Sequence, residues 1–346
     1  MVEVAPRSTP LRIHYRSCLL IIFILFLLLL ALLYSIFGTS WGASNSFTEP
    51  FRRYLSVLNR FRPNTKPEDN LKSALRIHRV EKLSEKRYAM FFSITDSNSE
   101  PVLSIQPSEI TIQASDIGMS RKPAIIEKLT PLHIANHLSN DRLFFSGIMD
   151  YSGSMFKEDI ENIKKYYSGL INGVLFPFKA NVFKFSSSVD EITSFTGDKT
   201  KLETSVCDSY PIGDSTALYD AMDKGLSSVQ SQPNLRLLIV TTDGNDNASS
   251  IVQNEILRRM KAHSVSAFML GFGWLKVETL KKISEETDGY FIYTPQSSDL
   301  NTWFPKIAKI INNVYVAEFT AQKELSIPCS VELTVNHAGI TMSRVK

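Results

Sequence analysis

LFFSGIMDYSGSM, residues 143–155, is the most informative stretch of the chain. It opens with a mostly apolar run at 143–149, which is typical of a strand buried in a parallel sheet. The turn that follows carries Asp150, Ser152 and Ser154 at alternate positions, so all three side chains can point toward one place. The stretch therefore predicts a central strand with a polar loop at its carboxyl end.

The alternation of buried strand and helix continues along residues 143–315, which predicts an α/β domain with a Rossmann-like, doubly wound and mostly parallel sheet. The expected strands are 143–149, 182–185, 235–241, 265–270 and 290–293. The expected helices are 157–170, 217–229, 251–262 and 277–286. Ligands of such sheets bind beyond the carboxyl ends of the strands, so we expect the functional residues there.

Two further loops carry oxygen ligands at that edge. GDSTALYDAM, residues 213–222, places Thr216 just before a helix. LLIVTTDGNDN, residues 237–247, places Asp243 directly after an apolar strand. Thr216 and Asp243 are therefore expected to meet the polar loop of the first strand.

The combined set has two carboxylates and three hydroxyls: Asp150, Ser152, Ser154, Thr216 and Asp243. Such hard oxygen ligands suit Mg²⁺, with Mn²⁺ and Ca²⁺ as alternatives, rather than zinc or copper. Five oxygens leave an octahedral ion one ligand short, and water or an oxygen from a bound molecule usually completes the shell. We expect an acidic group of a protein partner to fill that position.

The order Asp-x-Ser-x-Ser, Gly-x-x-Thr-Ala-Leu-Tyr-Asp-Ala and Thr-Asp-Gly resembles the von Willebrand factor type A (VWA) domain and its metal ion-dependent adhesion site (MIDAS). The resemblance covers residues 143–311 and includes a last strand, helix and strand at 266–300. It implies that Ser152, Ser154 and Thr216 contact the ion directly or nearly so. It implies that Asp150 and Asp243 act closely or through water, and that the domain binds rather than catalyses.

Each signal also has an ordinary structural explanation, because Ser, Thr and Asp are common in turns and at helix N-caps. Their joint occurrence in the right order favours the metal site. Asp214 departs from the usual family pattern and either modulates the site or is a solvated loop residue. Residues 245–247, Asn-Asp-Asn, fit no EF-hand spacing and indicate a polar loop.

Enzymatic activity has no positive support in the sequence. The six histidines are scattered without a Ser or Cys nucleophile motif, and Ile134 stands where a zinc protease has Glu beside its first His. Tyr151, Met155 and Trp274 lie near the expected ligand loops and could offer apolar contacts to a partner, although Trp274 could equally be packed. We therefore expect no enzyme and no catalytic residue.

Residues 18–37 form an apolar run without charge, long enough for a helix that crosses a bilayer. Arg7, Arg12 and Arg16 precede the run, so the positive-inside rule places residues 1–17 in the cytoplasm. The chain is then a single-pass cell-membrane protein with its domains in the periplasm or outside the cell. A cleaved signal peptide is the alternative, although the run exceeds the usual signal length.

Composition and the remaining segments complete the expected organisation. Residues 38–75 are expected to be a stalk or linker and 76–142 a β-rich flanking region. The β-rich residues 316–346 either complete that flanking β-domain around an inserted central domain or add edge strands to the central sheet. A net charge of +3 argues against nucleic acid as a partner, and Cys207 with Cys329 could be a disulfide or two thiols.

The sequence thus predicts a membrane-tethered, metal-dependent protein-binding module. The alternative is a structural or accessory subunit of a membrane complex, in which the VWA domain serves as an assembly scaffold.

Overall fold

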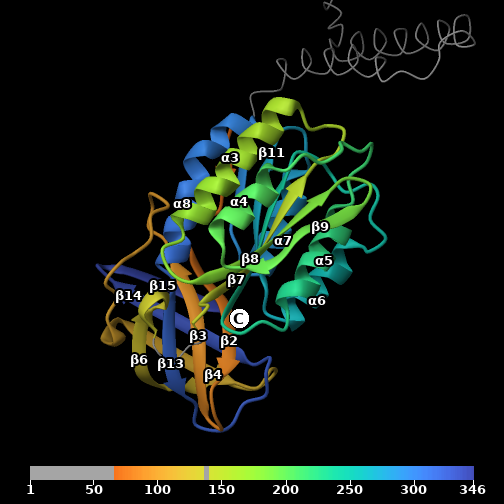
Figure 1. Cartoon of the computed structure of the whole chain (residues 1–346). Helices are drawn as coiled ribbons and strands as arrows, with labels where there is room; N and C mark the ends of the chain where they lie inside the picture. Colours follow the sequence, from red (N-terminus) through yellow and green to blue (C-terminus); the bar gives the residue numbers. More distant parts are fainter. Residues whose placement is uncertain (1–65, 136–139) are drawn as a thin grey trace, which may run out of the picture. The chain divides into compact units, whose positions relative to one another are not determined.

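The computed structural model describes residues 66–135 and 140–346 (Figure 1). These residues belong to one compact unit, Arg62–Lys346. The expected cytoplasmic segment 1–17, the expected membrane span 18–37 and most of the expected stalk lie outside the described residues. Within the described ranges, no helix is both long and apolar enough to cross a membrane.

A seven-stranded sheet with the order β1-β12-β11-β10-β7-β8-β9 forms the centre of the α/β part. Its five inner strands are parallel, and the edge strands β1 and β9 run antiparallel to their neighbours, so the sheet is mixed. The predicted α/β fold is confirmed. The strands are β1 Glu68–Asp69, β7 Leu143–Asp150, β8 Phe178–Phe185, β9 Val189–Thr196, β10 Leu235–Thr242, β11 Ser266–Phe272 and β12 Phe291–Thr294.

Helices cover both faces of this sheet because successive residues of a buried strand point to opposite sides. Phe145 and Leu237 pack on one side with α3 (Lys157–Gly173), α4 (Lys199–Cys207) and α8 (Trp303–Asn312). On the other side, Ile148 and Leu238 pack with the remaining three helices. These are α5 Leu218–Val229, α6 Gln253–Ala262 and α7 Val277–Glu286. Short 3-10 helices occupy Pro107–Glu109, Leu132–Ile134 and Ser297–Thr302.

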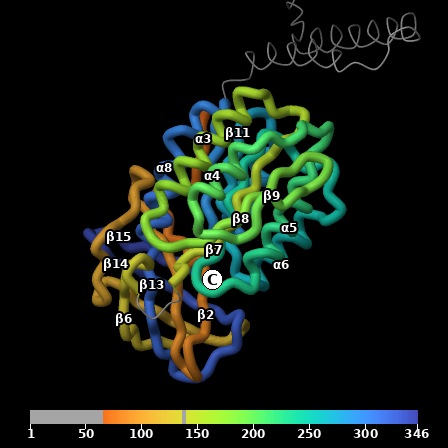
Figure 2. Tube along the Cα trace, viewed as in Figure 1, coloured from red at the N-terminus to blue at the C-terminus, as the bar shows by residue number. Residues whose placement is uncertain are grey.

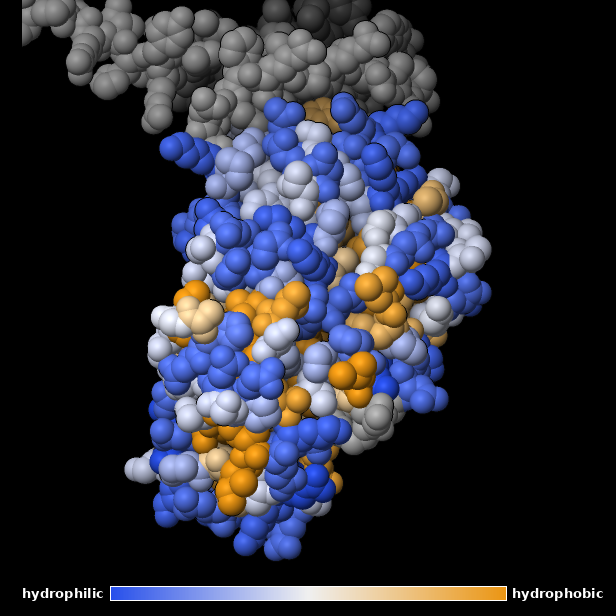
Figure 3. Space-filling model, turned by 90° about the vertical axis from the view of Figure 1, so that its left-hand side faces the viewer, coloured by the Kyte–Doolittle hydropathy of each residue, from blue (hydrophilic) through white to orange (hydrophobic). Residues whose placement is uncertain are grey.

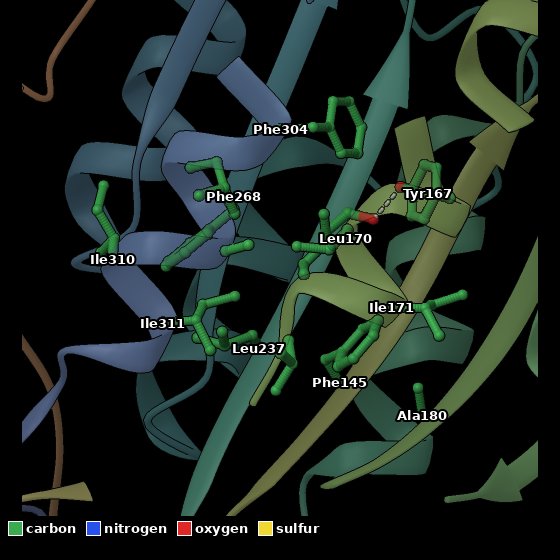
Figure 4. Packing of buried hydrophobic residues seen from close by; sticks show 14 of the residues in the cluster. Phe145, Tyr167, Leu170, Ile171, Ala180, Leu237, Phe268, Phe304, Ile310 and Ile311 are labelled. Carbon is green, nitrogen blue, oxygen red and sulfur yellow. Dashed lines mark hydrogen bonds between the residues drawn. The ribbon is translucent and has the colours of Figure 1, made fainter. Parts of the chain in front are cut away.

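Tyr167 anchors α3 to the sheet (Figure 4). Its ring is fully buried beside Phe304 of α8, with ring centroids 5.3 Å apart. Its hydroxyl donates to the carbonyl of Ile239 at 2.6 Å and lies 3.2 Å from the carbonyl of Ile148. One side chain therefore joins the helix to the neighbouring strands β10 and β7.

Two four-stranded antiparallel sheets pack face to face as a β sandwich, with the orders β2-β3-β13-β6 and β15-β14-β4-β5. β13 pairs with β3 and β6, and β14 pairs with β4, so strands from both sides of the α/β segment share the same sheets. In Figure 2, the orange tube of the early strands and the blue tube of the last strands lie side by side. The strands are β2 Leu75–Lys82, β3 Arg87–Ile94, β4 Ile110–Ser115, β5 Lys122–Pro123, β6 Ile125–Pro131, β13 Tyr315–Thr320, β14 Ser330–His337 and β15 Ile340–Val345.

The expected stalk does not extend to residue 75. Glu68–Asp69 forms strand β1 beside β12, and Leu71 and Ala74 are buried in the core. The polar residues of this segment give no strand pattern in the sequence, and β12, the strand with which β1 pairs, is more than 200 positions away. Cys207 is exposed and Cys329 is buried, and both are free thiols.

The sandwich contacts the amino ends of the central strands. His78 on β2 hydrogen-bonds the hydroxyl of Ser266, the first residue of β11, at 3.2 Å, and that of Ser93 on β3 at 2.8 Å. The Ser93 hydroxyl in turn lies 2.8 Å from that of Tyr290, just before β12. Arg344 on β15 pairs with the carboxylate of Asp288 at 2.7 Å. The sandwich therefore packs on the edge of the sheet opposite to Asp150.

The surface is mostly hydrophilic on the face drawn in Figure 3, with separate apolar patches. Among the described residues, the most exposed large apolar side chains are Leu175, Ile125, Ile117, Val252, Met119 and Trp274.

We predict that Tyr167→Phe lowers the free energy of unfolding by about 1–2 kcal/mol, because the ring still packs but its buried hydrogen bonds are lost. Urea unfolding of the two proteins measures the difference. Tyr166→Phe is the matched control, because its hydroxyl bonds the carbonyl of Ser298 at a part-exposed position and should cost less. Equal stability of Tyr167→Phe and the unsubstituted protein would show that the hydroxyl adds nothing.

We also predict an acid-labile contact at His78. Burial, followed by the charge of Lys346, lowers the pKa of His78 to about 3, with Asp288 and Arg76 also near. Between the unfolded pKa of about 6.5 and the folded value, only the unfolded chain gains a proton. Stability contributed by neutral His78 is therefore present above pH about 6.5 and falls by about 1.4 kcal/mol per pH unit below it.

The measurement is the free energy of unfolding at pH 7 and pH 5 for the unsubstituted protein and for His78→Gln. The unsubstituted protein should lose about 2 kcal/mol more than the variant over this interval. Parallel losses in the two proteins would exclude His78 as the titrating group.

Candidate metal-binding site

The structure places the five candidate ligands at the carboxyl edge of the sheet. Asp150 is the last residue of β7, and Asp243 directly follows β10. These two strands are parallel neighbours, with Met149 opposite Thr241, so the two carboxylates leave the sheet side by side. Strand pairing therefore brings Asp150 close to Asp243. In the sequence, Asp150 is 92 positions from Thr242, the residue directly before Asp243.

Hydrogen bonds join four of the candidates. The Ser154 hydroxyl donates to Asp243 Oδ1 at 2.6 Å, and the Ser152 and Ser154 hydroxyls are 3.2 Å apart. The backbone amide of Ser152 donates to Asp150 Oδ1 at 2.7 Å. The first loop is thus tied to both carboxylates.

Thr216 completes the cluster from a third loop. A Cβ built on Gly244 would lie 3.3 Å from Thr216 Oγ1 and 3.6 Å from Ser154 Oγ, so both hydroxyls face the same glycine. The amide of Thr216 donates to Asn247 Oδ1 at 2.7 Å, and the amide of Asn247 donates to the Thr216 carbonyl at 3.0 Å. All five predicted residues are brought together.

Close backbone packing explains the glycine of the GDST stretch. The amide of Gly213 donates to the carbonyl of Tyr151 at 3.1 Å, which holds the second loop against the first. A Cβ at Gly213 would come within 2.6 Å of the Ser186 Cβ, closer than real side chains approach. Glycine is therefore needed here for the loops to meet.

The carboxylates of the site are buried, with Asp150 1% and Asp243 5% exposed. Burial raises the pKa of Asp150, and its hydrogen bonds come from the neutral groups of Ser152 and Thr242, which lower the pKa but do not supply a charge. A buried carboxylate held by neutral donors is costly, and a bound cation would offset that cost.

The donor set fits an oxygen-preferring divalent cation. Over residues 66–135 and 140–346, no group of three or more His, Cys, Asp or Glu could hold a metal, so hydroxyls must supply part of any coordination shell at this edge. Carboxylate and hydroxyl oxygens with water suit Mg²⁺ or Mn²⁺ better than a thiol- or imidazole-seeking ion.

Sequence reasoning missed two supporting residues. The Thr242 hydroxyl donates to Asp150 Oδ2, and Asn247 holds the backbone of Thr216. Their neighbours Asn245 and Asp246 bind the amides of Lys276 at 2.6 Å and Tyr219 at 3.2 Å. The polar loop 245–247 therefore fixes the starts of α5 and α7, a role that its Asn-Asp-Asn sequence alone does not indicate.

The expected apolar contacts near the ligands are partly corrected. Tyr151 and Met155 are buried, at 2% and 1% exposure, and therefore pack in the core instead of facing a partner. Trp274 is 60% exposed on the loop between β11 and α7, which excludes the packed alternative for this side chain. Asp214 is exposed on its loop, in line with a solvated residue.

Solved structures with a similar fold include proximal thread matrix protein 1 from the mussel byssus, 20% identical, with a TM-score of 0.44 over 50% of this chain and 48% of that one. The match thus spans about half of the mussel protein, for which a structure with a zinc-occupied MIDAS motif exists. BatB from Bacteroides thetaiotaomicron is 15% identical, with a TM-score of 0.42 over 49% of this chain and 98% of that one.

A von Willebrand factor type A protein from Catenulispora acidiphila is 9% identical, with a TM-score of 0.45 over 81% of this chain and 72% of that one. No curated protein matches the chain. Residues 148–306 match the sequence model of the von Willebrand factor type A domain, and they lie in the α/β part described above. This chain therefore contains a von Willebrand factor type A domain.

Proposed function

We propose that the VWA domain is a metal-dependent protein-binding module. The supporting observation is that three separate loops bring five oxygen-bearing side chains together at one edge of the sheet, around a buried carboxylate held by neutral donors. A divalent cation at this place would satisfy both carboxylates. Its remaining coordination position would take a carboxylate from a protein partner.

The residue roles in this proposal are those that the resemblance to the MIDAS implies. The hydroxyls of Ser152, Ser154 and Thr216 would hold the ion, with Asp150 and Asp243 acting on it directly or through water. Mg²⁺ is the proposed ion, with Mn²⁺ and Ca²⁺ as alternatives. When bound, the ion supplies a positive charge that attracts an acidic oxygen, which is binding chemistry and needs no bond to be broken.

The proposal includes a tether. Residues 18–37 would anchor the chain in the cell membrane, with residues 1–17 in the cytoplasm and the VWA domain in the periplasm or outside the cell. The alternative function is a scaffold subunit of a membrane complex. That alternative differs in one measurable way, because a scaffold would keep its partner when the metal is removed.

We predict that the purified full-length chain binds Mg²⁺ or Mn²⁺ saturably in isothermal titration calorimetry. Asp150→Ala should weaken binding by at least about tenfold, a loss reached even when a group that only supports a metal ligand is removed. Asp214→Ala is the matched control, because it removes an equal charge from an exposed position near the same loops. Equal losses in both variants would indicate general electrostatics rather than a defined site.

Melting temperatures can show whether Asp150 is a metal ligand or only a residue that caps a turn. We predict that Asp150→Asn, without metal, melts at the same temperature as the unsubstituted protein or higher, because a buried charge is removed while an oxygen acceptor remains. Mg²⁺ at about 100-fold above its Kd should raise the melting temperature of the unsubstituted protein by about 5 °C and leave the variant unchanged. The opposite result has two parts: the variant melts at a lower temperature without metal, and Mg²⁺ does not change the melting temperature of the unsubstituted protein. It would show that Asp150 only caps the turn by accepting the Ser152 amide.

A further inference from the structure

Two large apolar side chains are exposed at the carboxyl edge of the central sheet, among the residues that the structure describes. Val252 stands just before α6 and is 66% exposed, and Trp274 stands on the loop before α7 and is 60% exposed. A single exposed apolar side chain is ordinary, but Trp is enriched at the hot spots of protein interfaces, whereas Val is under-represented there. Trp274 is therefore the stronger candidate for a contact with a partner.

The indole ring of Trp274 is free to be covered. Within residues 66–135 and 140–346, no aromatic ring or cation stacks on it, and no acceptor bonds its N–H. Apolar surface left in water costs free energy, which a partner that covers the ring would recover.

The loop before α7 is held on both sides of Trp274. On one side, the Tyr293 hydroxyl donates to the carbonyl of Gly273 at 2.8 Å. On the other side, the amide of Lys276 donates to Asn245 Oδ1 at 2.6 Å. A side chain on a fixed loop loses little conformational freedom when a partner binds, so more of its contact energy appears as affinity.

Strand pairing limits the distance between Trp274 and the candidate metal site. Thr242, directly before Asp243, pairs with Gly271 on β11, and Trp274 is three residues beyond Gly271. With about 3.8 Å between consecutive Cα atoms and about 4.8 Å between paired strands, the Cα atoms of Asp243 and Trp274 are at most about 20 Å apart. A standard interface covers about 800 Å² of each partner and is therefore about 30 Å across, so one partner can cover both places.

The charges beside Trp274 favour an acidic segment with an apolar side chain. The loop from Gly273 to Lys276 carries one charge, that of Lys276, and no carboxylate of the described residues pairs with this ammonium. A cation over the indole would be repelled by the ammonium and by the proposed metal ion, whereas carboxylates in the same segment are attracted by both. The side chain that covers the indole should therefore be uncharged and apolar.

We propose that Trp274 determines which acidic segment of a protein partner is bound. The segment carries an aromatic or large aliphatic side chain within about six residues of the acid on the metal, and this side chain packs on the indole. The inference rests on the proposed metal-dependent binding and adds a sequence preference to it.

The test uses the full-length chain and an immobilised library of synthetic thirteen-residue peptides with a fixed central Asp, in Mg²⁺ and in EDTA. Residues on either side of the Asp then reach about 20 Å in an extended peptide, which covers the largest separation that strand pairing allows. We expect Mg²⁺-dependent capture, with aromatic and large aliphatic residues enriched at least about threefold among the captured peptides.

Three variants assign this preference to one side chain. Trp274→Ala should bind Mg²⁺ normally, lose the preference and bind the most enriched peptide at least about tenfold more weakly, as the loss of a hot-spot residue does. Trp274→Phe keeps an aromatic face and should retain most of the preference. Leu175→Ala is the matched control, because Leu175 is 81% exposed at the amino edge of the sheet, and it should change neither measurement.

The outcomes separate the two proposals. Mg²⁺-dependent capture without an apolar preference, or with a preference that Trp274→Ala leaves unchanged, would overturn the assignment of Trp274 and leave the metal-dependent module standing. An equal loss in Leu175→Ala would trace the preference to general surface hydrophobicity and would overturn the assignment too. Capture that is the same in EDTA, or absent altogether, would contradict the metal-dependent module and the role of Trp274 with it.

Discussion

The parallel pairing of β7 with β10 is the constraint on which the candidate site depends. Because Met149 lies opposite Thr241, Asp150 lies level with Thr242, and Asp243 follows one residue further along the neighbouring strand. A shift of this register by one residue would turn every buried side chain of the strand to the other face, so the two hydrophobic clusters keep it in place. Core packing on both faces of the sheet therefore fixes the distance between the two acids.

The site holds the carboxylate of Asp150 in a buried position where no positively charged group is bonded to it. Asp150 is nearly inaccessible to water, and the groups that bond it are an amide and a hydroxyl. The packed strands and loops around Asp150 prevent its carboxylate from moving into water. Functional groups are usually held in unfavourable surroundings in this way. The loop 245–247 adds to this by fixing the helix starts around the site.

Local sequence patterns were sufficient to predict the five parallel strands and to place five oxygen-bearing residues together at their carboxyl edge. The apolar run 143–149 ends directly at Asp150, and the run 235–241 ends two residues before Asp243, so each acid could be assigned to a strand end. Glu68–Asp69 could not be predicted, since two polar residues carry no strand pattern and their partners, Tyr293 and Ile292, are distant in sequence. The contact of His78 with Ser266 and that of Lys276 with Asn245 likewise depend on residues that only tertiary packing brings together.

Strand β1 also fixes where the preceding residues join the described part of the chain. Glu68 pairs with Tyr293 near the carboxyl end of β12, so residue 66 lies at the edge of the sheet that carries the candidate metal site. Lys346 lies at the other edge, 3.2 Å from the carboxylate of Asp288. Immobilisation through Lys346 would thus present the metal-site loops outward, whereas immobilisation through residue 66 would turn them toward the support. A force that pulls the two ends apart loads β1 in shear against β12, and this two-residue pairing is the shortest in the sheet.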